Sequence, residues 1–130
     1  MDTAESETGD PQWDVLVATC PSRTSLARIA NKWTAIIVIA LGAERLRFTE
    51  LRTRVQGISG KVLTETLRDL ERHGIVARHA YAEIPPRVEY ELTDLGRTLF
   101  APLRALGDWA EQHIDEVERA RDAYDDRVSG

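Results

Sequence analysis

The chain has 130 residues, the length of a single domain, and 42% of them are hydrophobic, which is enough to bury a core. The longest uninterrupted apolar run, residues 35–41, is too short to span a bilayer. The acidic, polar beginning of the sequence predicts no secretory signal, and a single cysteine, Cys20, excludes an internal disulfide. Together these features predict a cytoplasmic protein without a membrane partner.

The net charge of −5 hides an uneven distribution along the chain. Residues 1–19 contain five acidic residues and no basic one, whereas residues 20–97 have a net charge of +4 and residues 98–130 a net charge of −4. A mildly basic centre is therefore flanked by acidic ends. The overall charge does not exclude a polyanionic partner for that centre.

Composition divides the chain into three parts. Residues 1–11 have little to bury and predict a disordered acidic tail. Residues 12–118 form the predicted domain, with a helix entrance at Cys20-Pro21, a buried helix over 35–41 and a short extended connection over 46–48. The charged residues 119–130 are expected to fray.

Residues 48–73 have the pattern of a short helix, a turn and a longer helix. The apolar residues of the first helix have the spacing i, i+3 and i+7, which places Phe48, Leu51 and Val55 on one face. Gly57 supplies the backbone freedom that a tight turn needs. Ser59 is placed to cap the second helix, and Gly74 is placed to end it.

The second of these helices is two-sided. Its apolar stripe consists of Leu63, Leu67 and Leu70. The opposite side is polar and charged, with Thr64 at its edge, and contains Lys61, Glu65, Arg68 and Arg72. Such a helix suits the major groove of DNA, although many charged helix faces are simply solvated. The sequence that follows favours the DNA alternative.

A hairpin is predicted directly after this helix. Residues 75–81 form a plausible strand, and residues 88–92 alternate between apolar and charged side chains. Pro85 and Pro86 between them predict a stiff loop, with Arg87 as a cation beside the tip. The order helix-turn-helix and two-stranded hairpin predicts a mainly α fold with a small β-hairpin wing, a winged helix-turn-helix of the α+β class.

The last helix is expected to begin at the cap residue Thr93 and to break or kink at Pro102. Beyond it lies a heptad-like seam made of Leu99, Leu103, Leu106, Trp109, Ala110, His113 and Val117. We interpret the seam as a dimer contact in preference to packing within one chain. His113 belongs to the seam, and no histidine has a partner at metal-ligand spacing, so neither metal nor cofactor is expected.

These residues resemble the HxlR-type winged-helix transcriptional regulators, relatives of the MarR group. The resemblance covers about residues 20–110. It is carried by Cys20-Pro21, Lys32-Trp33-Thr34, Arg47-Phe48-Thr49-Glu50-Leu51, Gly57-Ile58-Ser59, Lys61-Val62-Leu63-Thr64, Leu67-Arg68, Leu70-Glu71 and the run from Pro85 to Gly96. Asn31 departs from the glycine that usually precedes the Lys-Trp pair in the family. The resemblance implies a homodimer that is held by its N- and C-terminal helices and binds a pseudo-palindromic operator.

The leading hypothesis is a DNA-binding transcriptional regulator, a repressor, that is not an enzyme. We expect Lys61, Thr64 and Arg68 to read bases, with Glu65 either orienting Arg68 or accepting from a cytosine, while Arg72 and Arg87 hold phosphates. The complete predicted contact set is Ser59, Lys61, Thr64, Glu65, Arg68, Arg72 and Arg87. An interaction module without DNA binding would instead show apolar residues on the outward face, and a thiol enzyme would need partners that Cys20 lacks.

Cys20 has two readings that the sequence leaves open. It lies just before a predicted helix and near Arg23, which would favour the thiolate and fit a sensor of oxidants or electrophiles. A free cysteine is also commonly a small packing residue. The resemblance favours the sensor, because some members of the family sense quinones, aldehydes or oxidants through a cysteine in this position. A small molecule or an oxidant is therefore the expected inducer.

Overall fold

The computed structural model describes residues 12–130, so the tail predicted over 1–11 lies outside the described residues. The elements follow one another as α2 (Pro21–Ile29), α3 (Lys32–Leu41), β1 (Leu46–Arg47), α4 (Phe48–Arg54), α5 (Gly60–Arg72), β2 (Val76–Tyr81), β3 (Arg87–Leu92) and α6 (Asp94–Ser129). Helices dominate, and the strands form one small antiparallel sheet. The predicted mainly α architecture with a small β element is confirmed. In the described part of the chain, no single helix combines the length and apolar character needed to cross a bilayer.

Helix α3 is the centre of the core. Ile37 and Val38 are completely buried, because the helix is apolar on almost every side and packs against α4, α5 and α6. Asn31 caps this helix, since its side-chain oxygen accepts a hydrogen bond from the Thr34 N–H at 3.0 Å. The asparagine that departs from the family pattern thus satisfies one of the free N–H groups at the helix start.

Helices α4 and α5 form the predicted helix-turn-helix. Gly57 has a φ of 91°, a conformation that glycine adopts without the strain of a side chain, and it turns the chain between the two helices. The Ser59 hydroxyl accepts from the Val62 N–H at 3.1 Å, as its predicted capping role requires. The apolar stripe of α5 is buried in the core and consists of Leu63, Leu67 and Leu70. Burying this stripe fixes which face of α5 remains in solvent.

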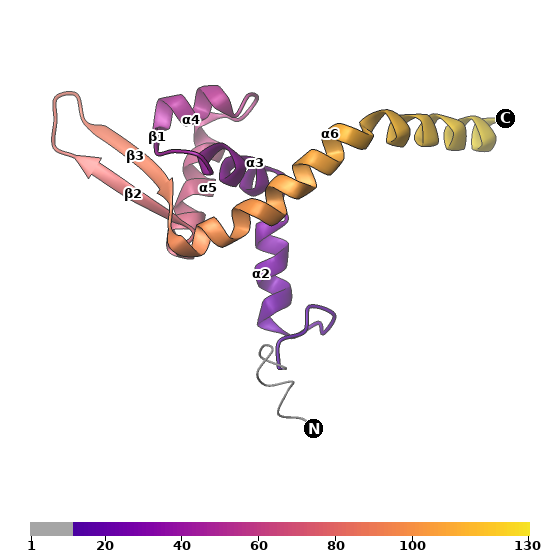
Figure 1. The fold of residues 1–130 in the computed structure, drawn as a ribbon, viewed down its shortest axis with the longest axis horizontal. Coiled ribbons are helices and arrows are strands. Elements are labelled where there is room, and N and C mark those ends of the chain that lie inside the picture. Colours follow the sequence, from indigo (N-terminus) through magenta and orange to yellow (C-terminus); the bar gives the residue numbers. More distant parts are fainter. Residues whose placement is uncertain (1–11) are drawn as a thin grey trace.

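The sheet has three strands in the order β1-β3-β2, so the prediction of a two-stranded hairpin was incomplete. The short connection before α4 pairs with the hairpin, with Leu46 opposite Tyr90 and Arg47 opposite Glu89. Two residues are too few to give a strand signal in a sequence. The hairpin of β2 and β3, which we call the wing, extends away from the helices beside α5 (Figure 1).

Helix α6 is a single helix of 36 residues that projects beyond the rest of the fold (Figure 1). Thr93 caps it by accepting from the Gly96 N–H at 3.0 Å, as predicted. Of the predicted break or kink at Pro102, the break does not occur: proline removes only one N–H from the ladder, Leu103 is part of the core and Leu99 packs against it. The structure also continues the helix through residues 119–129, where fraying was expected.

Candidate nucleic-acid interface

The outward face of α5 carries cations that are not neutralised. Lys61, Arg68 and Arg72 are exposed, and none of them forms an ion pair with another residue in the described range 12–130. Glu65 is exposed beside them, and Thr64 is half-buried at the edge. Ser59 is also exposed, with its hydroxyl engaged as the helix cap. The structure therefore brings the α5 members of the predicted contact set onto one accessible surface without an apolar patch.

Arg52 belongs beside this surface, although the sequence analysis did not select it. It is an exposed residue of α4, and its Nη1 would lie 3.3 Å from a Cβ placed on Gly60, the first residue of α5. Its guanidinium therefore adds positive charge near the N-terminus of α5, which itself favours anions. In the sequence, Arg52 directly follows Leu51, which lies on the buried face of α4. That position already indicated that Arg52 lies on the outer side of the helix.

Arg87, the cation predicted beside the wing tip, is held in ion pairs. Its Nη2 lies 2.7 Å from a Glu83 oxygen, its Nη1 lies 2.6 Å from a Glu89 oxygen, and its guanidinium stacks 3.9 Å from the centre of the Tyr81 ring. The hydrogen bonds to Glu83 and Glu89 raise the pKa of Arg87, and the hydrogen bond from Arg87 lowers the pKa of Glu83. Only 23% of the Arg87 side chain is exposed. Its charge is compensated within the wing.

Cys20 lies at the entrance to α2, as predicted, and is 7% exposed. Its Sγ lies 3.0 Å from the Ser22 hydroxyl and accepts a hydrogen bond from the Asp14 N–H at 3.1 Å. The Ser22 hydroxyl and then the Asp14 N–H lower the pKa of the Cys20 thiol. Residues 12–19, which include its covering segment, are all exposed. Within the described residues, the thiol thus accepts a hydrogen bond from a segment that is itself exposed.

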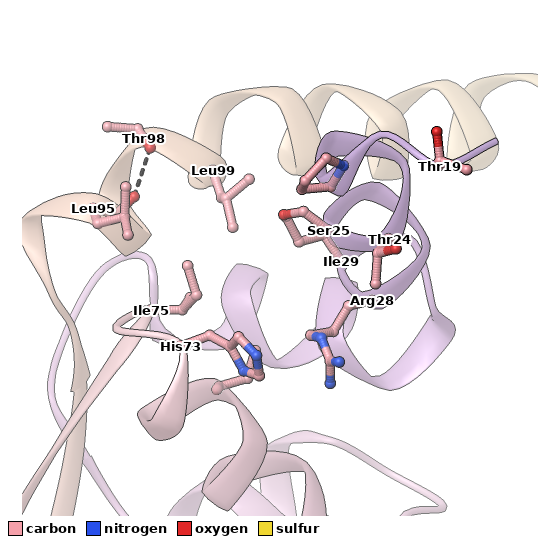
Figure 2. A pocket seen from close by; sticks show the side chains of 12 residues that line it. Thr19, Thr24, Ser25, Arg28, Ile29, His73, Ile75, Leu95, Thr98 and Leu99 are labelled. Carbon is pink, nitrogen blue, oxygen red and sulfur yellow. Dashed lines mark hydrogen bonds between the residues drawn. The ribbon is translucent and has the colours of Figure 1, made fainter. Parts of the chain in front are cut away.

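A pocket of about 610 Å³ lies between α2, the end of α5 and the start of α6. Figure 2 shows Ile75, Leu95 and Leu99 on one side of the pocket and the α2 side chains on the other. Arg28 and His73 lie at one end. Arg28 also connects α2 to α5, since its Nη1 lies 2.7 Å from Oδ1 of Asp69. The pocket adjoins the Cys20 segment through Thr19 and Pro21.

The predicted seam on α6 divides into two parts. Leu103, 8% exposed, belongs to the core of its own chain, and Leu99 packs against that core. For these two leucines the structure favours packing within the chain. Leu106 is 61% and Trp109 53% exposed, and Ala110, His113 and Val117 lie on the same part of α6. Residues 12–130 contain no group of three or more His, Cys, Asp or Glu side chains that could hold a metal ion.

Helix-turn-helix, wing and unneutralised cations on the second helix define a winged-helix DNA-binding protein. A sequence profile of the HxlR-like helix-turn-helix family matches residues 28–118. The HTH-type transcriptional regulator YtfH of Escherichia coli strain K12 is 41% identical over 103 residues, which cover 79% of this chain and 82% of YtfH. The chain therefore belongs to the HxlR-like helix-turn-helix family of transcriptional regulators, as the sequence resemblance indicated.

Two solved structures support the same assignment. The transcriptional regulator ytfH from Salmonella typhimurium has a TM-score of 0.79 and 35% identity, covering 85% of this chain and 98% of its own. The redox regulator HypR in its reduced form has a TM-score of 0.69 and 37% identity, covering 76% of this chain and 98% of its own. The prediction of a helix-turn-helix transcriptional regulator is confirmed, and its winged-helix fold is shared with these proteins.

Proposed function

We propose that this protein is a cytoplasmic repressor that binds an inverted-repeat operator as a homodimer and is released when Cys20 is modified. The observation that carries the proposal is the outward face of α5, where Lys61, Arg68 and Arg72 are exposed and form no ion pair within residues 12–130. Three free cations on a helix whose other face is fixed by core leucines present a rigid positive surface to DNA. We call α5 the recognition helix.

The homodimer is supported by apolar surface that a single chain leaves uncovered. Leu106 and Trp109 on α6 are exposed, and α2 has no buried residue along its whole length. Contiguous exposed apolar side chains on long helices mark interaction surfaces. In a dimer that binds an inverted repeat, the two recognition helices are expected roughly 34 Å apart, the distance between successive major grooves on one side of duplex DNA.

The signal is proposed to act through the thiol of Cys20. Its lowered pKa favours the thiolate, which is the form that reacts with oxidants and electrophiles. HypR, which is similar to this chain, is described as a redox regulator and has been solved in reduced and oxidised forms. With one cysteine per chain, oxidation can give a Cys20–Cys20 bridge across the dimer, a mixed disulfide with a small thiol or an alkylated thiol. A bridge needs the two Cα atoms within about 7 Å, so the mixed disulfide or the alkylated thiol is the expected product. Either product adds bulk at the start of α2.

The pocket of about 610 Å³ offers a second place for an inducer. Its volume lies in the range of small-molecule sites, and its walls are mainly apolar with Arg28 and His73 at one end. A ligand there would touch α2, the recognition helix and α6 together. This route differs from the thiol route in one testable respect, because it does not require Cys20.

The test compares two sets of three charge-removing substitutions by fluorescence anisotropy with duplex DNA. Replacing Lys61, Arg68 and Arg72 with alanine is expected to abolish sequence-specific binding and to make the salt dependence shallower by about one unit, because Arg72 is the proposed phosphate contact among the three. Replacing Arg119, Arg121 and Arg127 on the end of α6 removes the same charge and is the matched control. Equal losses in both sets would contradict the proposed interface, because they would reflect net charge alone.

A further inference from the structure

The two faces of the wing carry different chemistry. Cross-strand neighbours share a face, so the pairs Val76–Leu92, Arg78–Tyr90 and Ala80–Val88 form one face of the hairpin. The other face is formed by the pairs Ala77–Glu91, His79–Glu89 and Tyr81–Arg87. Because Val76, Tyr90 and Leu92 are buried, the first face is the one turned toward the helices. Arg78 is therefore on the inner face of the wing, and Arg87 is on the outer face.

The outer face carries a network of ion pairs, which also includes Arg97 of α6, 3.6 Å from a Glu91 oxygen. Glu89 pairs with Arg87 at 2.6 Å and with Arg45 at 3.4 Å, and Glu91 pairs with Arg45 at 2.7 Å and with His79 at 2.7 Å. Burial acts to raise the pKa of Glu89, but the hydrogen bonds and charges of Arg87 and Arg45 outweigh it and lower that pKa. The carboxylates of this face compensate its cations, so it offers little free positive charge to a polyanion.

Arg78 has a different environment. It is exposed and forms no ion pair with any residue in the part of the chain that the structure describes. Together with Arg68 it lines a groove of about 430 Å³ between the recognition helix and the wing. The groove also includes the Thr64 hydroxyl, the Glu71 carboxylate and an apolar wall made of Phe48, Val88 and Tyr90. Two free guanidinium groups thus face one open groove from two different elements.

We propose that Arg78 is the residue through which the wing contacts DNA, by holding a backbone phosphate that enters this groove beside the recognition helix. A guanidinium group offers several N–H donors in a planar arrangement that matches phosphate oxygens. Arg68 stays a base reader at the mouth of the groove, and Thr64 can donate a hydrogen bond to the same strand. Arg87 holds the hairpin in shape instead of contacting DNA. The inference rests on the proposed function, since it names a contact within the same interface.

Glu71 provides an independent check, because it is the only acidic side chain among the described residues that line the groove. A phosphate held there would be repelled by its carboxylate. Glu71→Gln is therefore expected to bind duplex DNA a few times more tightly than the wild type, while a groove that holds no phosphate would leave affinity unchanged.

The main test measures duplex affinity against salt concentration, from about 50 to 200 mM, for the full chain and single variants. Arg78→Ala is expected to weaken binding about tenfold on both preferred and random duplexes and to make the salt slope shallower by about one unit. Arg78→Lys keeps the charge and is expected to recover most of the slope. Arg87→Ala and the α6 control Arg97→Ala are expected to keep the wild-type slope.

The possible results distinguish a wrong assignment of Arg78 from a wrong proposal of DNA binding. A wild-type slope in Arg78→Ala, or a slope that falls in Arg87→Ala instead, overturns the assignment of Arg78 while the regulator still binds DNA. Failure of the wild type to bind any duplex contradicts the proposed function itself. Thermal unfolding serves as the folding control, because Arg78→Ala removes no ion pair between described residues and is expected to leave the melting temperature unchanged.

Discussion

Arg28 and Asp69 connect the helix that begins beside the cysteine to the recognition helix. The Arg28 Nη1 lies 2.7 Å from the Asp69 Oδ1, and both side chains are about one-third exposed, 38% and 33%. An ion pair this accessible contributes at most about 1 kcal/mol to stability. Its importance is therefore geometric, because it joins the last turn of α2 to α5.

We predict that Arg28→Ala weakens the response to thiol modification more than it weakens folding. The melting temperature is expected to change little, because the lost pair is partly exposed. The ratio of DNA affinities before and after treatment of Cys20 with an electrophile should fall toward one. Arg54→Ala, which removes an exposed ion pair with Glu44 away from α2, is the matched control. An unchanged ratio in Arg28→Ala would show that the signal takes another route.

Arg68→Ala is expected to alter sequence preference. Its guanidinium is exposed on the recognition helix and free of ion pairs within the described range, so it can make a bidentate contact with a guanine. Its loss should cost about 1–3 kcal/mol on the preferred operator and relax the preference at one base position. Competition binding with single-base operator variants measures this. An identical preference profile in the variant would argue against base readout by Arg68.

The Cys20 thiol is expected to react as a thiolate at lower pH than an ordinary cysteine. The hydrogen bond with Ser22 is the largest cause of the lowered pKa. The thiolate is present above the pKa of Cys20 in the folded protein and is lost as the pH falls through that pKa. Ser22→Ala should raise this pKa and therefore shift the pH profile of alkylation by iodoacetamide to higher pH. Identical pH profiles for the wild type and Ser22→Ala would show that Ser22 does not lower the pKa of Cys20.

The sensor hypothesis for Cys20 also makes a direct prediction for DNA binding. Treatment with a quinone or a mild oxidant should lower the operator affinity of the wild type and leave that of Cys20→Ser unchanged. If the two proteins respond alike and the native thiol resists labelling, Cys20 is a packing residue. The pocket lined by Arg28 and His73 then becomes the place to seek an inducer.

Helix α6 is expected to hold the dimer through its exposed part only. Leu106→Glu combined with Trp109→Glu should give folded monomers in analytical ultracentrifugation, because both side chains are exposed in one chain. Leu103→Ala should instead destabilise each chain by about 2–5 kcal/mol, since it leaves a cavity in the core. A charged variant that still sediments as a dimer would place the interface elsewhere.

The sequence was sufficient where local chemistry decides the structure. Ser59 and Thr93 cap the helices that their positions indicated, and the leucine spacing identified the buried face of α5. Pairing between distant segments was harder to predict. Leu46 and Arg47 are too few to show the alternating pattern of a strand, so their pairing with β3 could not be predicted from the sequence. Most of the predicted α5 contacts lie on one exposed face, which follows from helical periodicity.

Arg87 shows how the fold adds to what the sequence says about a cation near the wing tip, because the structure places it in ion pairs. Glu83 precedes Arg87 by four residues, in the loop before β3. Glu89 follows Arg87 by two residues, so the strand period of two places both on the same face of β3. That spacing was available in the sequence, but the hairpin geometry was needed to show that both carboxylates reach the guanidinium. The proposed role of Arg78 could not be predicted from the sequence, since only the fold places it in one groove with Arg68.

The most direct test of the central claim is selection of bound sequences from a pool of random duplex DNA. The account predicts enrichment of an inverted repeat whose half-sites are about one helical turn apart, bound by two chains. Loss of the enriched motif in the variant lacking Lys61, Arg68 and Arg72 would tie the motif to the recognition helix. Failure to enrich any sequence, or enrichment of an asymmetric site bound by one chain, would contradict the dimeric operator-binding account.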